Sequence, residues 1–198
     1  MKLLLHILIT LFPILCYAQS IVKIEGFGQI NCPKNMEVQG GAYKEYVDNV
    51  KEINGISASK VILQQKGLNG GNGGLDTYAR VMIRISFGDF NPLTTPITES
   101  DANDVNEIFE SQIKNKAYSN NAVILYWSKA IATTLNGYKA VRFGYKRKIG
   151  SNPVVTVSTF LIQNTDRMYS ITFENRTDNY NWADTFATIM KSLSIIKQ

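Results

Sequence analysis

The sequence predicts a single α+β domain, a mostly antiparallel sheet with helices packed on it. Three observations lead to this class. Four strand-like runs follow one another between residues 123 and 176 and are joined by short turns, the pattern of an antiparallel meander. A long helical run precedes them at 99–117, and an amphipathic run follows at 179–193. Because no repeat or linker is visible, residues 19–198 are expected to form one domain.

The N-terminal part of the sequence indicates short secondary-structure elements. Residues 19–35 hold an apolar segment that a proline ends, and residues 36–38 fit a brief strand. Aromatic and apolar residues recur at roughly helical spacing over 42–53, which indicates a weak helix or a structured loop. Residues 60–65 predict another short strand. The glycine-rich run 67–74 leads into a strand rather than into the Lys-Ser/Thr and helix of a phosphate-binding loop, so we interpret it as a connection.

The middle and the end of the chain are more regular. Residues 78–87 alternate between apolar side chains on one face and Arg80, Met82, Arg84 and Ser86 on the other. Thr98 is expected to cap the 99–117 helix, with Asp101 near its positive end. Asn136-Gly137 is a strong hairpin signal between the strands predicted at 123–133 and 138–149. Further turns separate the strands predicted at 154–163 and 167–176.

Residues 1–18 are expected to be a cleaved secretory signal peptide. Lys2 supplies the positive charge, a short apolar run follows, and small residues precede the junction after Ala18. Lipidation of Cys16 is not expected, because the bulky Leu15 occupies the position where a lipoprotein signal has a small residue. No second apolar run of spanning length follows. The sequence thus predicts a bacterial protein that is periplasmic or secreted.

Cleavage of this leader restricts the available chemistry. It would remove the only histidine, His6, and one of two cysteines, leaving Cys32 as a single thiol. A zinc site needs several His or Cys ligands, and serine nucleophiles need a base, so neither is expected. The whole chain has 21 Lys and Arg against 16 Asp and Glu, and loss of Lys2 lowers its formal charge from +5 to +4. This mild excess, interpreted as spread along the chain, predicts no nucleic-acid partner, and no cofactor is expected.

Carboxylates leave one enzymatic alternative open. Asp166, Glu174, Asp178 and Asp184 are close in sequence, and a carboxylate-dependent hydrolase acting on glycans would need two of them facing across a cleft. Carboxylates are also common at turns, at helix starts and on solvated strand faces. The sequence favours this second interpretation.

The candidate binding site is basic. Arg142, Lys146 and Lys148 share one parity on the 138–149 strand, and Arg80 and Arg84 share the polar parity of the 78–87 strand. If like faces align in one sheet, these five cations form one surface with the polar residues of the neighbouring strands. That surface could receive an acidic protein segment or an anionic envelope ligand. An ordinary solvated sheet face is the alternative.

Three segments resemble patterns of the PsbP-like α/β/α sandwich superfamily, in particular exported bacterial members of unknown function. They are residues 30–38, residues 135–142 with their glycine turn, and residues 182–195 with the closing helix. The resemblance covers most of residues 26–196. It implies accessory or binding proteins of photosynthetic, transport and envelope systems, with no shared catalytic centre to carry over.

Together these observations predict an exported, non-catalytic binding or accessory protein of the bacterial cell envelope. Its ligand is expected to be a protein or an anionic envelope component, held by the basic face or by the loops at 67–77 and 89–97. The glycan hydrolase remains the alternative. No membrane span is expected to persist after cleavage of the leader.

Overall fold

A computed structural model describes residues 20–40, 61–68, 77–88, 98–178 and 180–196. The predicted leader at 1–18, the segment 42–53, most of the glycine-rich run 67–74 and the loop 89–97 lie outside these residues. Within them, no helix is both long enough and apolar enough to cross a membrane.

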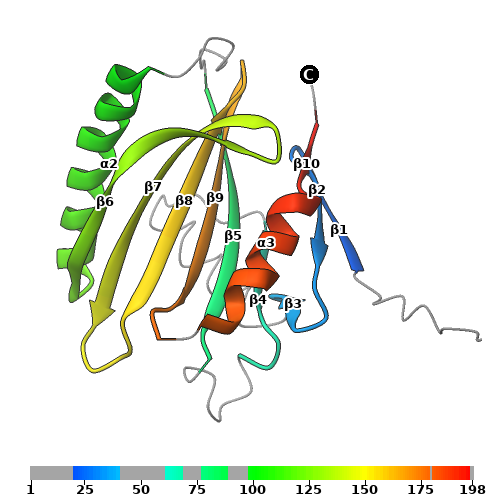
Figure 1. Cartoon of the computed structure of the whole chain (residues 1–198), viewed down its shortest axis with the longest axis horizontal. Coiled ribbons are helices and arrows are strands. Elements are labelled where there is room, and N and C mark those ends of the chain that lie inside the picture. Colours follow the sequence, from blue (N-terminus) through cyan, green and yellow to red (C-terminus); the bar gives the residue numbers. More distant parts are fainter. Residues whose placement is uncertain (1–19, 41–60, 69–76, 89–97, 179, 197–198) are drawn as a thin grey trace, which may run out of the picture.

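Seven strands form one antiparallel sheet in the order β3-β4-β5-β9-β8-β7-β6 (Figure 1). In chain order, the strands are β3 (Met36–Val38), β4 (Val61–Gln65), β5 (Ala79–Phe87), β6 (Ala122–Leu135), β7 (Tyr138–Ile149), β8 (Val155–Gln163) and β9 (Arg167–Arg176). The last four form the predicted meander. Since β9 returns to pair with β5, the N-terminal strands extend the same sheet.

The β6–β7 hairpin turns at Asn136-Gly137, as predicted. Both residues have positive φ angles, 47° and 84°, the conformation that matches the twist of the flanking strands. The hairpin reaches the C-terminal end of the chain (Figure 1), where the Asn136 amide donates to the Leu193 carbonyl at 2.7 Å. This contact joins residues that are 57 positions apart.

Helix α2 (Glu99–Ser119) packs on β6 and is capped as expected. The Thr98 hydroxyl accepts a hydrogen bond from the Asp101 amide at 3.2 Å, and the Asp101 carboxylate accepts one from the Thr98 amide at 2.8 Å. This reciprocal capping box satisfies donors that a helix start leaves open. Phe109 of α2 and Trp127 of β6 both contact the ring of Phe143 in β7.

Helix α3 (Ala183–Ser192) covers the other face of the sheet. A 3₁₀ turn, η1 (Tyr180–Trp182), precedes it, so the predicted run at 179–193 is split into two elements. Phe186 and Ile189 of α3 belong to the main core, together with alternate residues of β5 and β9. The two helices therefore lie on opposite faces, which we call the α2 face and the α3 face.

A small second sheet, which the sequence analysis did not predict, closes the domain. Its order is β1-β2-β10, formed by β1 (Ser20–Ile24), β2 (Gly28–Cys32) and β10 (Ser194–Ile195). Gly28 has a φ of 136°, and a Cβ there would lie 1.9 Å from the Ser194 carbonyl oxygen. Only glycine allows so close a backbone approach.

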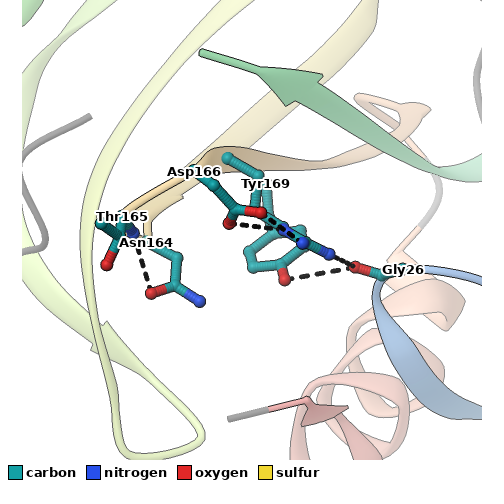
Figure 2. A network of polar contacts seen from close by, with 6 residues as sticks. Gly26, Asn164, Thr165, Asp166 and Tyr169 are labelled. Atoms are coloured by element: carbon teal, nitrogen blue, oxygen red, sulfur yellow. Dashed lines mark hydrogen bonds and ion pairs between the residues drawn. The ribbon is translucent and has the colours of Figure 1, made fainter. Parts of the chain in front are cut away.

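A polar clamp joins this small sheet to the main one. The carbonyl of Gly26 accepts hydrogen bonds from Arg167 Nη1 at 3.1 Å and from the Tyr169 hydroxyl at 3.2 Å (Figure 2). Arg167 is itself ion-paired with Asp166, and its guanidinium lies over the ring of Phe87. Figure 2 shows the β8–β9 turn at Asn164 and Thr165 next to the clamp. These charged groups are therefore used to hold the two sheets together.

Candidate functional site

The five predicted basic residues lie on two faces of the sheet rather than one. Arg84 pairs with Ser170, which pairs in turn with Leu161 on the α2 face. Arg80 has the same parity as Arg84 and shares this face. The prediction of a single five-cation surface is therefore wrong.

The other three cations lie on the α3 face. Arg142 pairs with Phe160, a residue of the main core, and Lys146 pairs with Thr156. Lys148 follows at the same parity. The physical reason for the split is register. The alternation along one strand shows which of its side chains share a face, but not which side chains of the neighbouring strand lie on that same face. A shift of the pairing register by one residue moves every side chain of a strand to the other face.

The cations of β7 stand opposite apolar residues of the edge strand β6. Register pairs Val123 with Lys148, Tyr126 with Lys146, and Ile131 with Arg142. These apolar side chains are 60%, 58% and 45% exposed, respectively. We call these six residues the cation–apolar face: Val123, Tyr126, Ile131, Arg142, Lys146 and Lys148. Among the described residues, no helix covers this part of the α3 face, because α3 packs nearer the opposite edge of the sheet (Figure 1).

The cation–apolar face lies in a part of the chain without carboxylates. Residues 111–165 contain eight Lys and Arg and no Asp or Glu. The positive charge is therefore concentrated in this segment and not spread evenly, contrary to the interpretation given above. Such an imbalance attracts anionic partners over distances longer than a single contact. In the sequence, the long gap between successive acidic residues was the signal that reveals this concentration of positive charge.

A second basic feature lies on the α2 face. Arg80, Arg147 and Arg176 line a hollow of about 220 Å³, together with Tyr78, Ile149, Asn152, Pro153 and Val155. We call this hollow the arginine pocket. Of the predicted site residues it includes Arg80, and it adds Arg147 and Arg176, which the sequence analysis missed. Strand parity could have separated Arg147 from Lys146 and Lys148, but only the sheet order brings it close to Arg80.

A buried carboxylate organises the wall of the arginine pocket. Glu174 accepts a hydrogen bond from the Tyr78 hydroxyl at 2.6 Å and pairs with Arg147 at 3.2 Å, and its side chain is only 7% exposed. Burial and the charge of Glu174 raise the pKa of Tyr78. Burial alone would lower the pKa of Arg147, but the charge of Glu174 and the two nearby tyrosines raise it on balance. Arg147 therefore stays protonated.

Three of the four carboxylates proposed for a hydrolase are engaged in ion pairs. Asp166 pairs with Arg167, Glu174 with Arg147, and Asp178 with Arg176. Asp184 lies in the first turn of α3. A second hollow of about 330 Å³ adjoins the arginine pocket and shares Arg147 and Ile149 with it. Among the described residues, neither hollow is lined by Asp or Glu, so the geometry gives the hydrolase alternative no support.

Cys32 is an ordinary core residue. Cys32 is buried, and burial raises the pKa of its thiol, which disfavours the reactive thiolate. Across the described ranges, no group of three His, Cys, Asp or Glu is placed to hold a metal ion.

Comparison of the structure with solved structures shows a PsbP-like fold. The chain superposes on cyanobacterial PsbP (CyanoP) from Synechocystis sp. PCC 6803 with a TM-score of 0.57 and 12% identity, covering 93% of this chain and 96% of that one. It superposes on LpqN, a protein involved in cell envelope biogenesis of Mycobacterium tuberculosis, with a TM-score of 0.50 and 12% identity, covering 85% and 82%. No family model and no curated protein sequence matches the chain. The resemblance inferred from sequence is thus confirmed at the level of fold.

Proposed function

We propose that this protein is an extracytoplasmic, non-catalytic binding module of the bacterial cell envelope that holds an acidic protein partner on its cation–apolar face. The observation that carries the proposal is the pairing of Val123, Tyr126 and Ile131 with three cations in a segment without carboxylates. The leader-like N-terminus and the fold shared with an envelope protein support the location.

The composition of this face favours a protein over a simple polyanion. A polyanion needs cations alone, whereas protein interfaces combine apolar and aromatic anchors with charged residues around them. Tyr126 lies at the centre of the face, between Val123 and Ile131 along β6. Ser158, opposite Gly144, adds a small polar side chain beside Lys146.

The test combines site-specific crosslinking with charge removal. The full chain, with a photocrosslinker in place of Ser158, is expressed in the bacterial envelope, and the captured protein is then purified for affinity measurements. Lys146→Gln with Lys148→Gln is expected to weaken binding by about 10-fold or more, since two charge-assisted contacts are lost. Both side chains are outside the main core, so the free energy of unfolding should change by less than about 0.5 kcal/mol.

Lys114→Gln with Lys116→Gln is the matched control, because it removes the same charge from the same carboxylate-free segment but from helix α2. Equal weakening by both pairs would show general charge attraction and contradict a specific face. Tyr126→Ser separates the partner classes, because it should weaken binding of a protein and leave binding of an anionic polymer nearly unchanged. If only an anionic polymer is bound, the proposed partner is wrong.

A further inference from the structure

The arginine pocket has no role in the proposed docking surface, since it lies on the opposite face of the sheet. Its three arginines come from three different strands, β5, β7 and β9. The pairing order β5-β9-β8-β7 brings the start of β5 and the ends of β7 and β9 together around the hollow. Arginine presents a planar fork of donors that suits oxyanions, and several forks converging from different strands can surround one such group.

Each guanidinium is held in place by a neighbour. Arg80 lies over the ring of Tyr78, with 5.4 Å between its Cζ and the ring centroid. Arg147 pairs with Glu174 at 3.2 Å, and Arg176 donates from Nε to Asp178 at 2.9 Å. Side chains that are already ordered lose little conformational entropy when a ligand binds.

Two donors in this pocket wall are not satisfied. Nε of Arg80 and Nε of Arg147 are buried and have no hydrogen-bond partner among the described residues. Buried donors without partners are rare in native proteins, because each has lost its hydrogen bonds to water without a replacement. Both belong to side chains that line the same hollow, so these guanidinium groups keep donors that no described residue uses.

Charge favours an anionic ligand. Glu174 offsets Arg147 and Asp178 offsets Arg176, whereas Arg80 forms no ion pair with any residue in the described ranges. A bound anion would therefore meet an excess of positive charge in this hollow. We propose that the arginine pocket binds a phosphate group, either free or as the ester of a larger molecule, through Arg80, Arg147 and Arg176.

Isothermal titration calorimetry of the full chain with inorganic phosphate, at constant ionic strength, tests this proposal. The wild type should bind phosphate saturably. Arg80→Gln should weaken the affinity by about 10-fold or more, because a charged donor is lost. Arg84→Gln is the matched control. It removes the same charge from the same strand and face but does not line the pocket, so the affinity should change by less than about twofold.

Absence of saturable binding to the wild type would overturn the proposal, and so would equal losses in Arg80→Gln and Arg84→Gln. If Arg80→Gln does not fold, Arg80→Lys decides the question. It keeps the charge but loses the fork, and should bind phosphate more weakly than the wild type. Unchanged affinity in a folded Arg80→Lys variant would then count against the pocket.

Two further arms define the ligand. Acetate at the same ionic strength should bind more weakly than phosphate, and equal affinity would overturn the assignment to phosphate. The adjoining hollow shared through Arg147 and Ile149 leaves room for a substituent. Phosphatidic acid vesicles, compared with phosphatidylcholine vesicles, therefore test a lipid-borne source. Cosedimentation with phosphatidic acid vesicles that depends on Arg80 would identify a lipid headgroup as the ligand. Binding of inorganic phosphate without cosedimentation would identify a free or water-soluble phosphate.

Discussion

Helices α2 and α3 cover opposite faces of one sheet but contribute very differently to its core. Helix α3 has 10 residues and buries Phe186 and Ile189 in the main core. Helix α2 has 21 residues, of which only Ala102 is buried. Ala102 belongs to a smaller apolar cluster with Val141, Phe143 and Leu161. Helix length is thus no guide to the apolar contribution, because burial rather than the number of turns supplies the hydrophobic free energy.

This difference separates stability from binding within one domain. The α3 side, with β5 and β9, has an almost continuous apolar interior. The strands β6 and β7, next to α2, carry five of the eleven exposed large apolar side chains of the described residues and lie within the carboxylate-free basic segment. A domain can present such groups to a partner when another part supplies its folding free energy.

The largest predicted difference in stability concerns two isoleucines, one in each helix. Ile189→Ala in α3 should lower the free energy of unfolding by about 2–5 kcal/mol, because the side chain is fully buried and leaves a cavity. Ile113→Ala in α2 should cost less than about 1.5 kcal/mol, because Ile113 is only partly buried. Urea unfolding monitored by circular dichroism measures both. Equal losses would contradict the assignment of the core to the α3 side.

A second, smaller effect should appear at high pH on the α2 face. Burial and the charge of Glu174 raise the pKa of Tyr145 to about 12 from its ordinary value of 10. Because folding favours the neutral phenol, its contribution is complete below pH 10 and is lost as the pH rises through about 12. The full effect should not exceed about 3 kcal/mol, at 1.36 kcal/mol per pKa unit.

The measurement is a series of urea unfolding curves across this pH range, with tyrosinate absorbance followed in parallel. Tyr145→Phe should remove part of the alkaline loss, while Tyr126→Phe, at an exposed position, should leave it unchanged. If the two variants behaved alike, the buried phenol would not be the cause.

The smallest predicted effect on stability concerns the start of α2. Thr98→Ala removes the helix cap and should destabilise the protein by about 1 kcal/mol, with hydrogen exchange rising mainly in the first turn of α2. Hydrogen bonds from the Thr98 amide and hydroxyl lower the pKa of Asp101. The contribution of Asp101 is therefore present above its ordinary pKa of 3.8 and is lost as the pH falls through its lowered folded value.

Hydrogen exchange at neutral and acid pH checks this assignment. Ser100→Ala, two residues after Thr98 in the first turn, should leave exchange nearly unchanged. If exchange in β6 rose as much as in α2, local fraying would not explain the result.

Local signals in the sequence determined several elements of the main sheet and the start of α2. Alternation defined β5, Thr98 and Asp101 marked the start of α2, and Asn136-Gly137 marked the hairpin, because each depends on interactions between residues close in the chain. The carboxylate-free segment 111–165 was equally readable from the sequence. Tertiary structure decided the rest. Pairing register placed Arg80 and Arg142 on opposite faces, the small sheet formed where Gly28 meets Ser194, and the strand order gathered Arg80, Arg147 and Arg176 around one hollow. Such arrangements join residues far apart in sequence, so no local pattern specifies them.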